Sequence, residues 1–203
     1  MTTTNVFAEL LIIGIETLAW IALLIFCLFG YGWIDFAVFN NLAIAIPLAA
    51  ATYVLGIIMD RVSDTLLTGA DRVIRRKLLG ERVAQSFASL RLYILAQSPY
   101  LSADLDYLRS RLRIMRSSMI NFSLLAIFGA AFILIRLQIA PSTQYRAAAT
   151  VFLVGVILAS LSYYAWRASS ITYYLRLQTA FALLPSHREN DAATNAANTS
   201  TAK

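Results

Sequence analysis

The stretch SSMINFSLLAIFGAAFILI, residues 117–135, decides the fold class. It lies between Arg116 and Arg136 and holds 19 residues without a charge. About 20 apolar residues are needed to cross the hydrocarbon core of a bilayer, where an ionised side chain costs about 2.5–3.5 kcal/mol. Polar and apolar residues do not alternate in it, so it predicts a membrane-spanning helix and not a strand of a barrel.

Three further stretches have the same character. With the first, they predict four spans over residues 10–30, 36–59, 117–135 and 147–166. Of all 203 residues, 59% are hydrophobic and 14% are charged, whereas soluble domains carry about 25% charged residues. This composition excludes a water-soluble enzyme, a disulfide scaffold and a disordered polypeptide. We expect an all-α, polytopic membrane protein of four transmembrane helices, extended by cytoplasmic helices into a continuous helical bundle.

The basic residues predict the orientation. Eleven of the 17 Lys and Arg residues fall in segment 60–116 and four follow span four, while Arg136 and Arg146 alone lie between spans three and four. By the positive-inside rule, both termini and segment 60–116 are cytoplasmic. We therefore expect a multi-pass protein of a prokaryotic cytoplasmic (inner) membrane.

The cytoplasmic parts are expected to be helical. After span two, Val62, Leu66, Ala70 and Val73 fall on one helix face, and Gly80 is a suitable stop. A second amphipathic helix is expected over residues 83–98. A third begins near Ser102 and runs into span three. The predicted parts are an N-terminal hairpin (1–59), a cytoplasmic segment (60–116), a C-terminal hairpin (117–166), a helix extension (167–184) and a disordered tail (185–203).

Glu16 is the most informative single residue because a carboxyl group inside a span is expensive to keep. Matching depths along the four spans predicts an intramembrane polar layer of Glu16, Thr52, Tyr53, Asn121, Ser123, Ser160 and Ser162. Such a layer would be sensitive to protons or cations. The more ordinary interpretation, which we favour, is that Glu16 only holds helices together by hydrogen bonds.

Two groups of charged residues flank the spans. A cytoplasmic charge cluster comprises Asp60, Arg61, Asp64, Asp71 and Arg72, and is expected to form surface ion pairs or, alternatively, a latch or docking point. A basic collar comprises Arg75, Arg76, Lys77, Arg109, Arg111, Arg113 and Arg116. Juxtamembrane arginines attract anionic lipid headgroups, so membrane lipids are the expected partner of the collar, and nucleic acid is not.

Residues with catalytic or metal-binding chemistry are scarce. The chain has one cysteine, Cys27, within a span, and one histidine, His187, in the tail. We expect no metal site, no cofactor and no catalytic residues.

The leading functional hypothesis is a non-enzymatic scaffold, sensor or membrane-acting effector that works through its cytoplasmic helices. In this hypothesis, copies of the chain form a homo-oligomer or segment 60–116 binds a cytoplasmic protein partner. The alternative is a homo-oligomeric ion channel or pore with the polar layer around Glu16. A membrane-embedded enzyme ranks third, because no catalytic pair is evident inside the spans.

Overall fold

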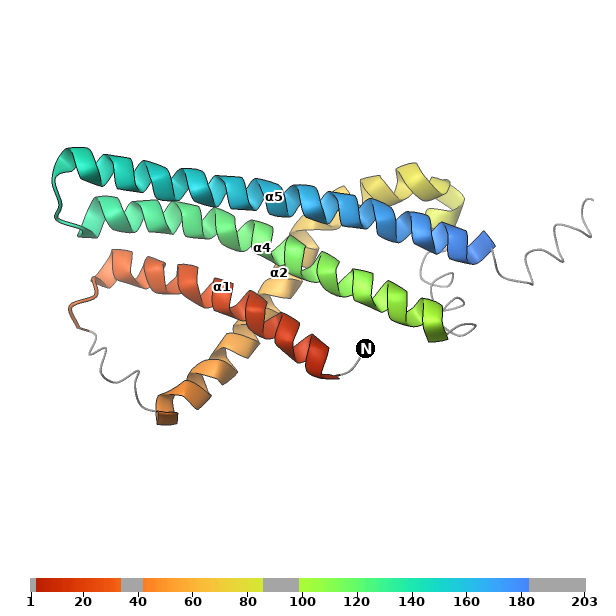
Figure 1. Ribbon diagram of the computed structural model, residues 1–203, viewed down its shortest axis with the longest axis horizontal. Helices are drawn as coiled ribbons and strands as arrows, with labels where there is room; N and C mark the ends of the chain where they lie inside the picture. The colour runs from red at the N-terminus through yellow and green to blue at the C-terminus, as the bar shows by residue number, and fades with distance from the viewer. Residues whose placement is uncertain (1–2, 34–41, 86–98, 183–203) are drawn as a thin grey trace, which may run out of the picture. The chain divides into compact units, whose positions relative to one another are not determined.

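The computed structural model of the chain describes residues 3–33, 42–85 and 99–182. These residues form four helices and no strand, as expected. The helices are α1 (Thr3–Phe29), α2 (Leu42–Gln85), α4 (Pro99–Arg136) and α5 (Pro141–Ala182), drawn in Figure 1. The start of expected span two, most of the expected 83–98 helix and the expected tail lie outside the described residues.

Each of the four helices is long and apolar enough to cross a membrane, which confirms four candidate spans. The apolar window of α5 is only 11% buried, and large apolar side chains such as Leu153 and Leu161 lie on its surface. Exposing such an apolar surface to water is unfavourable, whereas exposing it to lipid is not.

Glycine and proline set several helix boundaries. Gly30 has a φ of 77° and donates its N–H to Phe26 O at 2.9 Å, so α1 ends in a left-handed turn. Helix α5 begins at Pro141, where a missing N–H is tolerated. The expected stop at Gly80 is a break in α2, at φ 73° and ψ 163°, after which helix resumes to Gln85. Helix α4 runs without such a break into the third span, as expected.

The chain divides into two compact units. Unit 1 comprises residues 1–68 and 110–167, and unit 2 comprises residues 69–109 and 168–203. Helix α1 belongs to unit 1 alone, while α2, α4 and α5 each contribute residues to both units.

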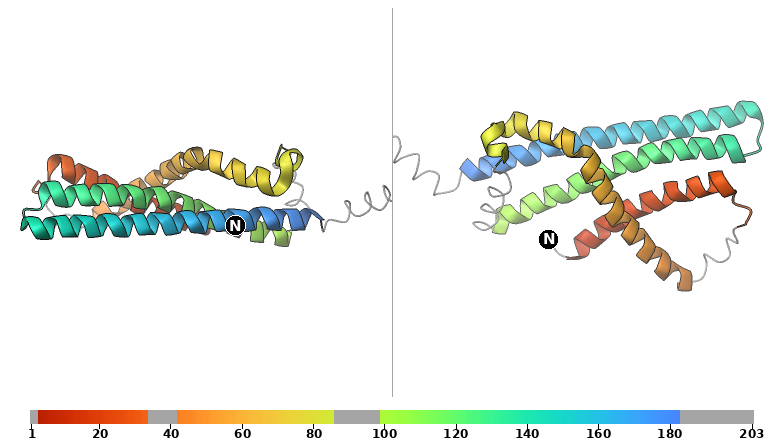
Figure 2. Two further views of the ribbon diagram at one scale, coloured as in Figure 1. Left: turned by 90° about the horizontal axis from the view of Figure 1, so that it is seen from above. Right: turned by 180° about the vertical axis from the view of Figure 1, so that it is seen from behind.

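In unit 1, two glycines allow α1 and α2 to cross in close contact (Figure 2, right). A Cβ atom on Gly14 would lie 1.8 Å from Thr52 O, and one on Gly56 would lie 1.9 Å from Leu10 O. Any side chain at either position would therefore force the two backbones apart. Gly14 faces Thr52, whereas Leu10, which is earlier in α1, faces Gly56, which is later in α2. The two helices therefore run antiparallel at the crossing.

Helices α4 and α5 form an antiparallel pair joined by residues 137–140 (Figures 1 and 2). A Cβ atom on Gly155 would lie 2.5 Å from Ala126 Cβ, so small residues set this contact too. The side-chain nitrogen of Gln144 donates to three carbonyl oxygens at the end of α4, those of Ile133, Leu134 and Leu137, each at 3.0 Å. These bonds satisfy carbonyls that the helix end leaves open.

Helices α1 and α4 lie parallel, because contacting residues are separated by a nearly constant 101–109 positions. Trp20 stacks on Phe128 with ring centroids 5.8 Å apart, and Phe26 contacts Phe132. Arg136 donates to Cys27 O at 2.9 Å and to Leu28 O at 2.6 Å. A side chain of α4 therefore caps the C-terminal end of α1.

Unit 2 has an apolar core of its own. Its buried apolar side chains come from all three helices that contribute to it: Leu79, Leu105, Leu108, Tyr173, Tyr174 and Leu177. Tyr174 donates its hydroxyl to Asp71 at 2.7 Å, and Arg176 pairs with Asp104 at 2.6 Å. The expected helical extensions of spans two, three and four thus pack against each other here.

The four apolar residues that share a helix face after span two, Val62, Leu66, Ala70 and Val73, are not buried. Val62, Leu66 and Val73 are 42%, 65% and 54% exposed. Thr52, Gly56, Met59 and Ser63, at spacings of four, three and four residues, are buried instead. Leu66 and Ala70 continue the same face farther along the helix, so burial here follows the contact of Thr52 and Gly56 with α1 and not the apolar stripe.

Candidate functional site

The carboxyl group of Glu16 is held by two uncharged donors of α4. Ser118 donates its hydroxyl to Oε1 at 2.9 Å, and Asn121 donates from Nδ2 to Oε2 at 3.1 Å. Glu16 is partly buried, Ser118 is buried, and Asn121 is fully buried. The site thus places a carboxyl group inside a candidate span without a cationic partner among these bonds.

Trp20 fixes the orientation of the Asn121 amide. The Trp20 indole N–H donates to Asn121 Oδ1 at 3.1 Å. Because an indole nitrogen can only donate, the Asn121 atom that faces it must be the oxygen. The Asn121 nitrogen therefore faces Glu16 and Ile13 O, which lie 3.1 and 3.3 Å away. The hydroxyl of Thr17, which donates to Ile13 O at 2.8 Å, lies 3.3 Å from Asn121 Oδ1.

Of the expected polar layer, Asn121 is the member that contacts Glu16. The hydroxyls of Thr52, Ser123 and Ser160 donate to the carbonyl four residues earlier in their own helices, at 2.7–2.8 Å. Tyr53 packs against Phe7, with ring centroids 5.1 Å apart. Ser162 is half-buried on α5. The contacts of Glu16 therefore join α1 to α4. The bonds of Thr52, Ser123 and Ser160 stay within their own helices.

An ionic cluster ties the same helices together near the start of α1. Arg113 lies 3.5 Å from both Glu9 and Asp60. Arg116 lies 3.1 Å from Asp60 and also pairs with Asp64. We call these five residues the Arg113–Arg116 cluster. Ser110 donates to the other carboxyl oxygen of Glu9, so α1, α2 and α4 all contribute to the network.

The remaining charged residues of the expected cluster and collar belong to both units. Arg61 and Arg111 are exposed in unit 1, while Asp71 accepts from Tyr174 in unit 2. Arg72, Arg76, Lys77 and Arg109 are exposed in unit 2, and Arg75 is half-buried there. The expected collar therefore contains two kinds of arginine. Arg113 and Arg116 face carboxylates of unit 1, whereas Arg61, Arg72, Arg76, Lys77, Arg109 and Arg111 have exposed side chains.

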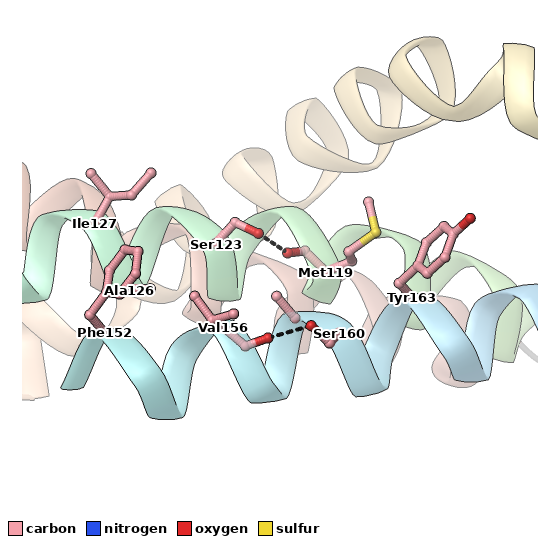
Figure 3. Close-up of a pocket in the computed structure, with 9 residues that line it drawn as sticks. Met119, Ser123, Ala126, Ile127, Phe152, Val156, Ser160 and Tyr163 are labelled. Atoms are coloured by element: carbon pink, nitrogen blue, oxygen red, sulfur yellow. Dashed lines mark hydrogen bonds between the residues drawn. The ribbon is translucent and has the colours of Figure 1, made fainter. Parts of the chain in front are cut away.

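A shallow groove of about 410 Å³ lies between α4 and α5 (Figure 3). Ser123 and Ser160 line it, but both hydroxyls are used within their own helices, as the dashed lines show. The other lining residues are Met119, Ala126, Ile127, Phe152, Val156, Ala159 and Tyr163. The groove is therefore an apolar surface on the two spans.

Sequence reasoning missed Glu9, Ser118 and Trp20. Their spacing carried a signal: Glu9 precedes Glu16 by seven residues, and Ser118 precedes Asn121 by three, so each pair shares a helix face. Depth matching finds residues at one level, but it does not tell which of them point at one another.

Across the described ranges, no group of three or more His, Cys, Asp or Glu side chains is placed to hold a metal ion. Comparison of the chain with protein-family models, curated proteins and solved structures gave no match. Fold and site together define a class: in its described ranges the chain is all-helical, with four helices able to span a membrane, and a partly buried carboxyl–amide network joins the first and third candidate spans.

Proposed function

We propose that this chain is a four-span protein of a prokaryotic inner membrane that acts without catalysis, as a scaffold, sensor or membrane-acting effector. In this proposal unit 2 is cytoplasmic and binds a protein, either a second copy of the chain or a soluble partner. Anionic lipid headgroups bind the exposed basic side chains.

The observation that carries this proposal is the separate core of unit 2. Three of the four helices able to span a membrane extend from unit 1 into unit 2 and pack together there, with Leu105 and Leu177 nearly inaccessible to solvent. Segments that only connected one span to the next would not need a buried apolar core. Val73 and Leu175 remain 54% and 47% exposed, which supports a protein-binding surface on this unit.

Site-specific photocrosslinking in native membranes tests the proposal. A photoreactive amino acid at Leu175, in unit 2, is expected to capture protein. Its matched control at Leu153, equally apolar and 60% exposed on the same helix, is expected to capture lipid. Coexpressed copies with two different tags distinguish self-capture from a second protein. Lipid adducts alone at both positions would contradict the proposal.

A further inference from the structure

One face of α4 carries polar side chains from its middle into the third span. Ser110, Arg113, Ser117 and Asn121 follow each other at spacings of three, four and four residues, which places them on one side of the helix. Ser110 and Arg113 contact Glu9, and Asn121 contacts Glu16. The face therefore connects the Arg113–Arg116 cluster with the carboxyl group inside the first span.

Ser117 lies between these two contacts and is itself unsatisfied. Its side chain is fully buried, and within the described part of the chain its Oγ has no hydrogen-bond partner. A buried hydroxyl without a partner costs about 1–3 kcal/mol. Buried waters in proteins typically satisfy such groups, with about three hydrogen bonds each. Ser117 lies one turn from Arg113 and one turn from Asn121 on this polar face, so its hydroxyl suits a water molecule and not an apolar ligand.

The two donors at Glu16 differ in how they respond to a proton. The Asn121 nitrogen faces Oε2 and cannot accept a hydrogen bond, so a proton cannot lie between these two atoms. The Ser118 hydroxyl faces Oε1 and can reverse its role. When Oε1 is protonated, Ser118 accepts from it and turns its own hydrogen to the carbonyl four residues earlier, a common bond for serine in helices.

Three arginines of α4 and one tyrosine of α2 make contacts with groups other than Glu16. On α4, Arg113 and Arg116 pair with Glu9, Asp60 and Asp64. Arg136 binds the carbonyls of Cys27 and Leu28 at the far end of α1. On α2, Tyr53 packs against Phe7. None of these interactions supplies a counter-charge to Glu16.

We propose that Glu16 is a proton-binding site, and that the proton reaches it from the Glu9 end of α1 through water held at Ser117. One proton adds to the carboxylate to give the acid, and the local charge rises by one. A metal ion would require a shell of oxygen ligands, whereas Asn121 turns a nitrogen donor toward the carboxyl group. The proposal is independent of any protein partner of unit 2.

Labelling of the full chain in lipid nanodiscs with dicyclohexylcarbodiimide tests the site. A carboxylic acid adds across one C=N bond of this apolar reagent, its proton passes to nitrogen, and the acyl group migrates to leave an N-acylurea with every atom retained. Peptide mass spectrometry is expected to find the adduct on Glu16 at low pH. Its yield should fall about tenfold per pH unit once the carboxylate predominates.

Two variants serve as controls for this labelling. Glu16→Gln removes the adduct, while Asp104→Asn, which changes an exposed ion pair with Arg176 in unit 2, leaves it unchanged. Labelling of Glu16 that is absent at every pH, or equal at every pH, would overturn the proposal. The decisive measurement uses the natural sequence, so it does not depend on how a variant folds.

The route is tested by thiol accessibility in a Cys27→Ala background. Ser117→Cys is expected to react with a water-soluble thiosulfonate reagent. Ala148→Cys, at a position 4% exposed on the span of α5, is expected to remain unreacted. Circular dichroism confirms that both variants keep their helices. An unreactive thiol at position 117 would contradict the proposed water route along this face of α4.

Discussion

At the level of single residues, Asn121 connects Glu16, Trp20 and Ile13 of α1 through one amide. Replacement by leucine keeps the size but leaves a partly buried carboxyl oxygen of Glu16 and the indole N–H of Trp20 without these partners. We expect Asn121→Leu to lower the free energy of unfolding by about 1–3 kcal/mol per group. Ser123→Ala, which removes a bond within α4, should change it by less than about 0.5 kcal/mol. Equal unfolding midpoints in detergent titrations would contradict this role of Asn121.

The composition of the site could be predicted only in part. Glu16 stands out because it interrupts an apolar run, and Asn121 lies at a matching depth in the third span. Ser118 does not stand out, because serine is common in spans and usually bonds to its own helix, as Ser123 and Ser160 do. Depth follows from counting residues, whereas direction depends on how each helix is rotated about its axis, and neighbouring helices determine that rotation.

Among the helices, the same substitution is expected to have opposite effects at two glycines: Gly14, in the contact between α1 and α2, and Gly69, in an open part of α2. Gly14→Ala places a methyl group against Thr52 O and should destabilise the protein by about 1–3 kcal/mol or more. Gly69→Ala, where the new atom meets nothing within 4 Å, should stabilise α2 by about 0.5–1 kcal/mol. Thermal unfolding of both variants measures the difference. Stabilisation by both would show that the crossing tolerates a wider separation.

The four long helices follow from the sequence because charge-free runs of about 20 residues leave few alternatives. The break at Gly80 also follows, since glycine readily adopts positive φ. The buried part of α2 does not follow from the sequence. Gly56 and Ser63 are buried, whereas Leu66, farther along the same face, is exposed. Apolar periodicity marks a helix face, but it does not tell which part of that face a neighbouring helix covers.

At the scale of the whole molecule, the distribution of charge predicts the same side of the membrane for both termini. A fluorescent protein fused after Lys203 should mature, because it would remain in the cytoplasm. An alkaline phosphatase inserted at Gln138, between α4 and α5, should be active, because it would be exported. The reciprocal fusions are the controls. Phosphatase activity at Lys203 would overturn the proposed orientation.

The cap that Arg136 places on α1 bears on the order of assembly. The open carbonyls at Cys27 and Leu28 accept hydrogen bonds from a residue that is synthesised more than 100 positions later. The Glu16 carboxyl group likewise accepts a hydrogen bond from Asn121, which is synthesised 105 positions later. The contacts that complete the end of α1 and its carboxyl group can therefore form only after α4 has been synthesised.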